Sequence, residues 1–231
     1  MNPSSLDRRL AYVIPAFNEG EMLSRVIEEL RREAPPGLIL VVDDASVDDT
    51  GAVAARAGAQ VIRHPINRGQ GAALQTGFDA ARMLGAEVVI TFDADGQHDP
   101  LDVRRLLESL MAADSDVALG SRFLSPNQIP WLRKIVLRLG VAFTRIVSRL
   151  SITDTHNGLR AIRASALKSL RLKEDRMAHA SELLDLISAS KLKFVEVPCT
   201  IRYSAYSRGK GQRSSAAPRV AIEFLFGKLM R

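Results

Sequence analysis

The chain of 231 residues contains one cysteine, Cys199, and few aromatic residues. A single cysteine excludes an intrachain disulfide framework and suits a reducing compartment. Aromatic residues make up 5% of the chain, which leaves little surface for stacking nucleic-acid bases. A basic nucleic-acid-binding protein is therefore only a distant alternative, although a pI of about 9.8 would suit one.

Long hydrophobic runs are also missing. No apolar run approaches the roughly 18 residues that a membrane-spanning helix needs, and the run Ala11–Phe17 is too short for a signal peptide. We therefore expect a cytoplasmic protein, either soluble or peripheral at the membrane. With 46% hydrophobic residues the chain can form a sizeable core, and its length suits a single domain over residues 1–231.

Lysine is absent from residues 1–121, which carry a net charge of −8, whereas residues 122–231 carry +14. An acidic first half and a basic second half suggest a metal site in the first and anionic partners for the second. A solvated basic surface is the plainer alternative.

Short apolar runs alternate with helical patterns through the first half, which predicts βαβ units and a mostly parallel sheet. The motif Ser46-x-x-Asp49 is typical of a capping box at the start of a helix. The predicted strands are Ala11–Pro15, Leu38–Val42, Ala59–Arg63, Val88–Phe92, Asp116–Leu119 and Phe194–Val197, and the predicted helices are Glu19–Arg32, Asp48–Ala57, Gly69–Leu84, Pro100–Met111 and His179–Ser190.

Trp131–Leu150 is predicted to form one long amphipathic helix, and Ala216–Arg231 a shorter one. The polar side of the long helix carries only basic charges, which is typical of a helix lying on an anionic membrane surface. Its basic residues are Arg133, Lys134, Arg138, Arg145 and Arg149.

Acidic residues follow three of the predicted strands, at Glu19, at Asp43-Asp44, and at Asp93 with Asp95. Ligands of open parallel sheets bind at this edge. Asp93 and Asp95 are two positions apart, so an extended backbone points both carboxylates the same way. Two adjacent carboxylates need a neutralising cation, and oxygen ligands suit Mg²⁺ or Mn²⁺ bridging to a diphosphate. The sequence therefore predicts a divalent-metal site here.

The glycine-containing segment Asn67–Gly71 precedes a predicted helix. Its glycines would let the backbone approach an anionic ligand at the amino end of that helix. A plain loop is the alternative. The spacing matches neither a phosphate-binding loop of kinases nor the dinucleotide fingerprint, which disfavours both classes.

Six segments occur in the order found in family 2 glycosyltransferases: "VIPAFNE", "VVDDASVDDT", "NRGQGAALQTGF", "DADGQHDP", "GSRF" and "DTHNGLRAI". The chain most resembles the polyprenyl-phosphate sugar transferases of that family, such as dolichyl-phosphate mannose synthase, from Ala11 to about Tyr206. The resemblance implies a GT-A fold, which is an α/β fold with a Rossmann-like, mostly parallel central sheet flanked by helices. It also implies a nucleotide-sugar-binding half over residues 1–121 and a basic, helical acceptor-binding half over residues 122–231.

The resemblance assigns roles to individual residues. It implies nucleoside contacts at Pro15, Phe17, Glu19, Val41 and Asp43, sugar-nucleotide contacts at Asp93 and Ala94, metal ligands at Asp95 and Gln97 beside Asp93, acceptor-phosphate contacts at Arg122 and Arg133, a motif formed by Asp154, Gly158 and Arg160, and an acceptor-side glutamate at Glu182.

The chain also departs from the family pattern. Leu137 stands where the family often has serine, and Gln70 where it often has lysine. Near the end, Tyr206–Gln212 stands where the family has Arg-x-x-Gly-x-Ser-Lys, and Arg208 and Lys210 are candidates to supply the charge of that motif from shifted positions. These departures concern the donor's base and sugar more than the reaction type.

We expect an inverting, metal-dependent hexosyltransferase that uses a UDP- or GDP-sugar and a polyprenyl phosphate at the cytoplasmic face of the membrane. A phosphate acceptor is already anionic, so it requires positioning and charge neutralisation and no strong base. Mg²⁺ or Mn²⁺ would stabilise the leaving nucleoside diphosphate. The alternative acceptor is a hydroxyl of a glycan or glycolipid, with Asp154 as the base. The sequence leaves open whether a separate membrane protein recruits the chain.

Overall fold

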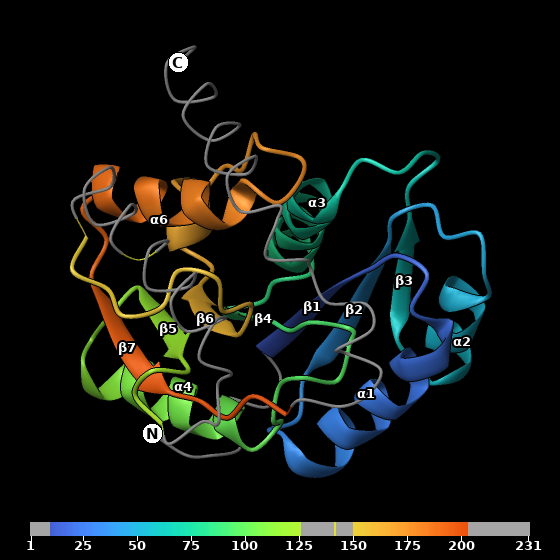
Figure 1. Cartoon of the computed structure of the whole chain (residues 1–231), viewed down its shortest axis with the longest axis horizontal. Helices are drawn as coiled ribbons and strands as arrows, with labels where there is room; N and C mark the ends of the chain where they lie inside the picture. The colour runs from blue at the N-terminus through green and yellow to red at the C-terminus, as the bar shows by residue number, and fades with distance from the viewer. Residues whose placement is uncertain (1–9, 126–140, 142–149, 203–231) are drawn as a thin grey trace.

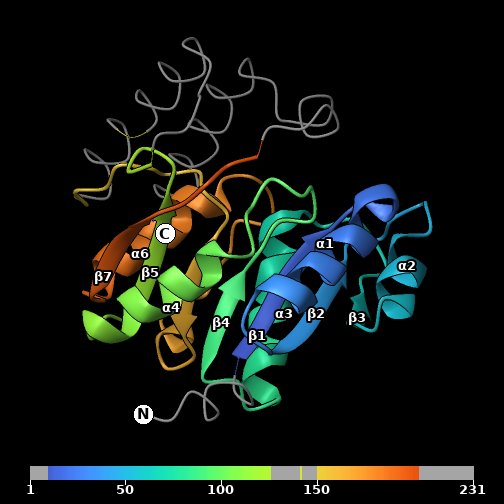
Figure 2. The same cartoon turned by 90° about the horizontal axis from the view of Figure 1, so that it is seen from below.

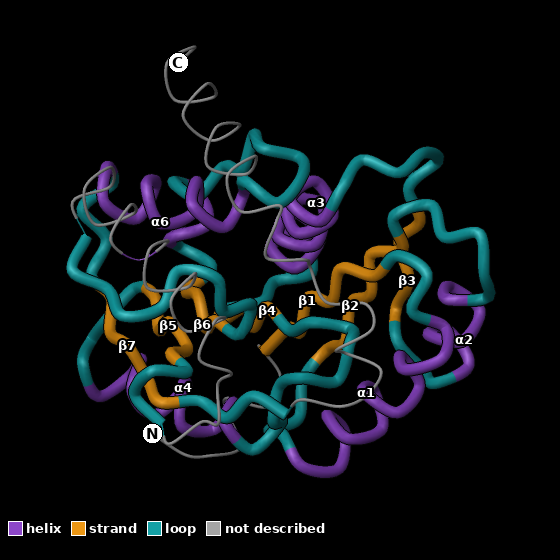
Figure 3. Tube along the Cα trace, viewed as in Figure 1, coloured by secondary structure: helices purple, strands orange, loops and turns teal. Residues whose placement is uncertain are grey.

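The computed structural model describes residues 10–125, 141 and 150–202, which form one mixed sheet between two layers of helices (Figures 1 and 3). The strands are β1 (Leu10–Ala16), β2 (Leu38–Asp43), β3 (Gln60–Arg63), β4 (Val88–Thr91), β5 (Val117–Ser121), β6 (Arg160–Arg163) and β7 (Phe194–Pro198). The helices are α1 (Gly20–Glu33), α2 (Thr50–Arg56), α3 (Gln70–Met83), α4 (Asp102–Ala112), the 3₁₀ turn η2 (Ala166–Lys168) and α6 (His179–Ala189).

Seven strands lie in the order β3-β2-β1-β4-β6-β5-β7, and all neighbouring pairs are parallel except those of β6. From β1 the chain moves outward to β2 and β3 and then starts again on the other side of β1 with β4. The reversal makes the carboxyl ends of β1 and β4 a topological switch point, where ligands of such sheets bind. The expectation of an α/β fold with a mostly parallel sheet is confirmed.

Helices cover both faces of the sheet (Figures 1 and 2). One core cluster joins the sheet to side chains of α1, α2 and α4, and the other joins it to α3 and α6. In α1, for example, Leu23, Val26, Ile27 and Leu30 are buried at helical spacing. Because both faces are covered, β1 is buried at all seven positions, as expected of a central parallel strand.

The six predicted strands, and the five predicted helices that fall within the described residues, are confirmed within one or two residues at each end. No strand was predicted over Arg160–Arg163, where the structure has β6. This strand is only four residues long and begins and ends with arginine, so it carries little apolar pattern. It forms because β4 and β5 both pair with it in the antiparallel direction.

Most of Trp131–Leu150 and all of Ala216–Arg231 lie outside the described residues, and so do Arg133, Leu137, Arg208 and Lys210. Among the residues that the structure describes, no helix has the length and apolar character needed to cross a membrane.

Candidate active site at the carboxyl edge of the sheet

The three acidic segments meet at one edge of the sheet. Ala16 at the end of β1 pairs with Asp43 at the end of β2, and on the other side Val13 pairs with Thr91 at the end of β4. The loops that carry Glu19, Asp43-Asp44 and Asp93 therefore leave neighbouring strands in the same direction, as the sequence predicts.

Side chains hold the first two of these loops together. Asn18, with φ of 56°, donates its N–H to Ser46 Oγ at 2.9 Å, and its Oδ1 accepts the N–H of Val47 at 2.9 Å. The N–H of Glu19 donates to Thr50 Oγ1 at 2.8 Å. The predicted capping box is wrong, because Ser46 bonds this neighbouring loop and α2 has no side-chain cap. The contacts fix the backbone from which Glu19 projects.

Asp43 is fully buried, and its charge is met within the protein. Arg63 Nη1 donates to Asp43 Oδ2 at 2.5 Å, and the N–H of Ser46 donates to Oδ1 at 2.9 Å. Arg63 Nη2 also donates to the carbonyl of Ser46 at 2.7 Å. The pairing with Arg63, at the end of β3, joins residues 20 positions apart, and no motif pointed to it.

Asp44 anchors the glycine-containing loop. Its carboxylate accepts the N–H groups of Arg68 and Gly69, at 3.0 and 2.6 Å, and lies 2.7 Å from His64 Nδ1. The N–H of Gly71 donates to the carbonyl of Asp175 at 2.8 Å. The amino end of α3 thus finds acceptors within the protein, which favours the structural explanation of these glycines over direct contact with a ligand.

Gly71 permits a close approach between two segments. A β-carbon at this position would lie 2.0 Å from the carbonyl oxygen of Glu174 and 2.8 Å from Cβ of His179. The start of α3 therefore packs directly against the loop before α6. The packing brings Gln70 and His179 to the same side of the sheet, next to the end of β4.

Both oxygens of the Asp93 carboxylate are held. Gln70 Nε2 donates to Oδ1 at 3.3 Å, and His98 Nε2 lies 2.9 Å from Oδ2. A β-carbon on Gly158 would lie 2.2 Å from this carboxylate, so glycine makes room for it. Burial acts to raise the pKa of Asp93, but His98, followed by the charges of Arg160 and His179, lowers that pKa overall. Asp93 is therefore ionised and fixed in place.

His98 packs edge-on against Phe92, with ring centroids 5.4 Å apart. Its Nδ1 is buried without a hydrogen-bond partner among the described residues. His98 lies in the core at 3% exposure, where its contact with Asp93 orients that carboxylate.

Asp95 carries negative charge that the protein compensates only weakly. Among the described residues its carboxylate accepts one hydrogen bond, from the N–H of Gln97 at 3.0 Å. Burial and the charge of Asp93, with a smaller contribution from Glu19, raise the pKa of Asp95 to about 6. The charge of Asp93 is one cause of this shift, so the two carboxylates are electrostatic neighbours. The extended backbone expected between them is wrong, because β4 ends at Thr91 and Ala94 and Asp95 lie in a turn.

These residues fit a divalent metal ion. Two neighbouring carboxylates, of which Asp95 is only weakly compensated by the protein, form a favourable place for a cation. The described residues contain no cluster of three or more His, Cys, Asp or Glu side chains arranged to enclose one. Mg²⁺ is typically held by one or two carboxylates together with water and substrate phosphates, so an incomplete protein ligand set agrees with an ion that arrives with a diphosphate.

The residues matched to nucleoside contacts differ in accessibility. Pro15 and Val41 are buried in β1 and β2, and Asp43 is fully buried. Phe17 is 44% exposed and Glu19 is partly exposed at the same edge. Of this set, Phe17 and Glu19 therefore present the most accessible side chains.

Arg122 and Asp154, which were expected to have separate roles, form a buried ion pair. Arg122 Nε donates to Asp154 Oδ2 at 2.6 Å, and its backbone N–H donates to the same oxygen at 3.1 Å. Arg122 Nη2 also donates to the carbonyl of His156 at 2.9 Å. The remaining Asp154 oxygen accepts the N–H of His156 at 3.2 Å. The Arg122 side chain is 6% exposed and that of Asp154 is 1% exposed.

Glu182 is fully buried in α6 and accepts the backbone N–H groups of Lys173 and Glu174, at 2.8 to 3.0 Å. These contacts hold the loop before α6. The structure thus gives Glu182 a supporting position behind the site.

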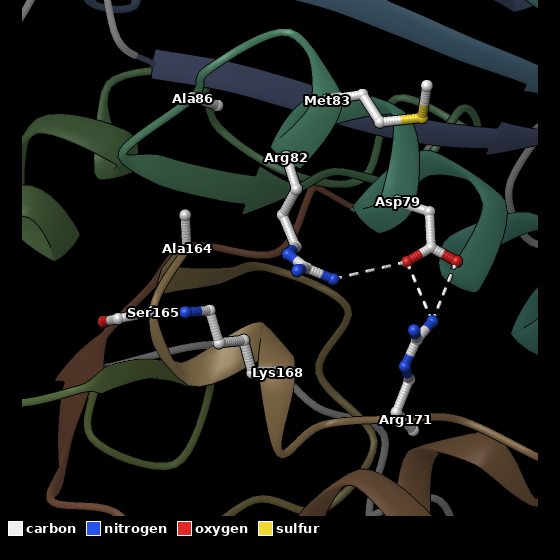
Figure 4. A pocket seen from close by; sticks show the side chains of 8 residues that line it. All are labelled: Asp79, Arg82, Met83, Ala86, Ala164, Ser165, Lys168 and Arg171. Carbon is white, nitrogen blue, oxygen red and sulfur yellow. Dashed lines mark hydrogen bonds and ion pairs between the residues drawn. The ribbon is translucent and has the colours of Figure 1, made fainter.

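A hollow of about 680 Å³ lies at the opposite edge of the sheet (Figure 4). Its lining includes Ala86, before β4, and Ala164, after β6. Arg82 and Arg171 both turn toward the Asp79 carboxylate, at 3.7 and 3.0 Å. The hollow is therefore remote from Asp93 and Asp95, and two of its cations already have an anionic partner.

The geometry agrees with comparisons to known proteins. Residues 12–171 match the family model described as glycosyl transferase family 2. The chain is 33% identical to a UDP-N-acetylglucosamine–dolichyl-phosphate N-acetylglucosaminyltransferase of Methanococcus voltae, over 96% of this chain and 97% of the relative. It is 37% identical to an undecaprenyl-phosphate mannosyltransferase of Micrococcus luteus, over 71% of this chain and 70% of the relative.

Among solved structures, glucosyl-3-phosphoglycerate synthase of Mycobacterium tuberculosis, in complex with Mn²⁺ and UDP-glucose, is similar with a TM-score of 0.71. The similarity covers 98% of this chain and 83% of that one at 21% identity. At this identity the match supports the fold, which is the expected GT-A fold.

Proposed function

The chain belongs to glycosyltransferase family 2, and from this premise we propose that it transfers a sugar from a nucleoside diphosphate to the phosphate of a polyprenol. The observation that carries the proposal is the pair Asp93 and Asp95, whose charge is incompletely compensated at the switch point of the sheet. The names of relatives support the acceptor, since two of them act on dolichyl or undecaprenyl phosphate.

Asp93, Asp95 and Gln97 would hold Mg²⁺ or Mn²⁺. The ion would supply electrostatic stabilisation of the leaving diphosphate. The protein's own contribution is to fix this ligand set, because His98 and Gln70 orient Asp93 while the N–H of Gln97 orients Asp95. Phe17 and Glu19 at the end of β1 would then contact the nucleoside.

The transfer step is a direct displacement. An oxygen of the acceptor phosphate forms a bond to the anomeric carbon, and the bond from that carbon to the diphosphate oxygen breaks. The bonding electrons leave with the nucleoside diphosphate, and the anomeric configuration inverts. A phosphate nucleophile is already anionic at neutral pH, so the site must chiefly align the reactants and balance charge.

The engagement of Asp154 favours a phosphate over a hydroxyl acceptor. A hydroxyl would need a base within hydrogen-bond reach, and Asp154 was the candidate. Both of its oxygens already accept hydrogen bonds, and one is paired with the buried Arg122. A carboxylate held in this way is poorly placed to receive a proton from a substrate.

We place the reaction at the cytoplasmic face of the membrane, with the protein bound peripherally. The net charge of +14 over residues 122–231 would attract anionic lipid headgroups. The predicted amphipathic helix over Trp131–Leu150 would lie on that surface, and Arg133 in it would reach the acceptor phosphate. Flotation with anionic and neutral liposomes tests this placement, and equal recovery with both would contradict it.

The function is tested by sugar transfer from UDP- and GDP-sugars to a polyprenyl phosphate, with Mn²⁺ or Mg²⁺ present. The free polyprenol serves as the control that lacks the phosphate. We expect product only with the phosphate, and none for Asp95→Ala, whose fold is checked by circular dichroism. Transfer to the free alcohol, or full activity of a folded Asp95→Ala, would refute the proposal.

A further inference from the structure

Arg160 occupies a central place in the candidate site, and the family resemblance places it in a motif with Asp154 and Gly158 without assigning it a contact. It is the first residue of β6 and pairs with Thr91 of β4 and with Leu119 of β5. Thr91 lies two residues before Asp93, and the Thr91 hydroxyl donates to the carbonyl of Gly158. Arg160 is therefore anchored at the same strand end as the predicted metal ligands.

The side chain points to the side of the sheet that carries α3 and α6. Leu159 and Ala161, on either side of Arg160 along β6, belong to the core cluster on the α1 and α4 side. Because side chains alternate along a strand, Arg160 faces the opposite layer. The same layer supplies Gln70, which bonds Asp93, and His179.

Arg160 has no hydrogen-bond partner for its guanidinium among the described residues, although it is only 4% exposed. Other arginines at this edge are engaged: Arg63 bonds Asp43, and Arg122 bonds Asp154. The Arg160 nitrogens are not among the fully buried polar atoms that lack a partner, so they retain some access to solvent and an incoming anion can reach them.

The charges around Arg160 come from both sides of the site. Asp93 and Asp154 act to raise its pKa, while burial, the largest effect, lowers it. The positive charge of Arg160 in turn lowers the pKa values of His156 and His179 after the larger effect of burial. Asp93 belongs to the predicted donor side and Asp154 to the predicted acceptor side, so Arg160 lies between them.

We infer that Arg160 binds a phosphate oxygen of a reactant, in addition to the arginines that the family resemblance points to. This inference rests on the proposed function. The planar guanidinium, with its fixed set of N–H donors, suits a phosphate, which offers several oxygens. Two reactants could bring that group: the diphosphate of the donor, or the phosphate of the acceptor lipid.

Calorimetric titrations on the full chain separate the two sources. One arm titrates UDP in the presence of Mn²⁺. The other titrates farnesyl phosphate into protein saturated with Mn²⁺ and UDP, with farnesol as the phosphate-free control. The variants are Arg160→Gln and Arg160→Lys. Arg171→Gln removes an arginine at the opposite edge of the sheet and is the matched control.

We expect Arg160→Gln to weaken binding at least tenfold in one arm, which corresponds to about 1.4 kcal/mol. Loss in the UDP arm assigns Arg160 to the donor, and loss in the farnesyl phosphate arm assigns it to the acceptor. Arg160→Lys keeps the charge but not the planar fork, so it should lose less. Arg171→Gln should stay within twofold of the wild type.

A titration with Mn²⁺ alone tests whether Arg160 binds phosphate or only holds Asp93 in position. Removing a nearby positive charge should leave Mn²⁺ affinity unchanged or higher. A parallel loss of Mn²⁺ affinity would mean that Arg160 acts only through Asp93, and would overturn the inference. So would a folded Arg160→Gln that binds both phosphate probes within twofold of the wild type.

Failure of this inference can be distinguished from failure of the proposed function. If the wild type binds neither probe, the proposed function fails and the inference fails with it. If the wild type binds and the variant binds equally well, only the inference fails. If Arg160→Gln does not fold, Arg160→Lys decides, since unchanged affinity in both arms would overturn the inference and weakened affinity in one arm would support it.

Discussion

Replacing Asp95 with asparagine is expected to stabilise the metal-free protein while it abolishes the response to Mn²⁺. The pKa of Asp95 is raised from 3.8 to about 6, mainly by burial and by the charge of Asp93. Between these values the folded protein binds more protons than the unfolded chain, so this carboxyl's contribution to stability falls as the pH rises. At neutral pH the ionised carboxylate therefore destabilises the fold. An asparagine would keep the acceptor for the N–H of Gln97 without the charge.

The magnitude follows from the shift in pKa. About two pKa units at 1.36 kcal/mol each give an upper bound of about 3 kcal/mol. Asp95 is partly exposed, and solvent screening reduces the expected gain to about 1–2 kcal/mol. For a domain of this size, each kcal/mol shifts the melting temperature by about 2–4 °C. Asp95→Asn should therefore melt about 2–8 °C above the wild type.

Thermal denaturation in the presence of EDTA measures this difference at pH 7.5 and at pH 5. At pH 5 most wild-type Asp95 is protonated, so the gap should shrink. With Mn²⁺ and UDP the wild type should gain stability and the variant should not. Asp114→Asn is the control, because Asp114 is 85% exposed and its φ of 43° suits asparagine. A gap that is equal at both pH values, or a less stable variant at pH 7.5, would refute the reasoning.

Three further results are expected. Burial raises the pKa of Cys199 to about 12, so a thiol reagent at pH 8 should label the unfolded chain once and the native protein not at all. Gly158→Ala would place a methyl group 2.2 Å from the Asp93 carboxylate; calorimetry should show at least tenfold weaker binding of Mn²⁺ and UDP, and unchanged binding would contradict the packing. Burial, followed by the charge of Arg160, lowers the pKa of His179 to about 4, so the unfolded chain takes up the proton first as the pH falls. This group alone lowers stability by up to about 2–3 kcal/mol between pH 6.5 and pH 4, so in urea denaturation the free-energy difference between the wild type and His179→Gln should change by about that amount over this range.

Local patterns were sufficient to predict most of the architecture. The apolar runs that became β1, β2 and β4 are bounded by turn residues, and their helices show regular apolar spacing, so the elements are visible without tertiary information. Strand β6 is different. Its four residues, Arg160–Arg163, become a strand only because β4 and β5 lie on either side, and a pairing of that kind leaves no local signal.

In the candidate site, too, local patterns predicted some features, and others depended on residues distant in the sequence. The spacing of Asp93 and Asp95 predicted that their carboxylates would lie close together, and the charge of Asp93 is among the causes that raise the pKa of Asp95. The partners of the acidic residues were not predicted, because each one is distant in the sequence or carries no motif of its own. Arg63 lies 20 positions from Asp43, and Arg122 lies 32 positions from Asp154.

These partners explain which of the acidic groups remains available for a ligand. Asp43 is paired with Arg63, and Asp154 with Arg122. Asp44 accepts two backbone N–H groups. Each of these carboxylates is already stabilised by the chain, so none of them requires a metal ion.

Asp95 differs from this group. Its carboxylate has one backbone donor among the described residues, and the neighbouring charges of Asp93 and Glu19 oppose its ionisation. A bound cation would reverse the sign of that interaction, since it would turn a repelling pair of carboxylates into a pair of ligands. Proximity alone therefore does not select the metal site from the acidic residues at this edge. The deciding feature is that the fold leaves this one carboxylate short of positive charge, and a metal ion carrying a diphosphate would supply it.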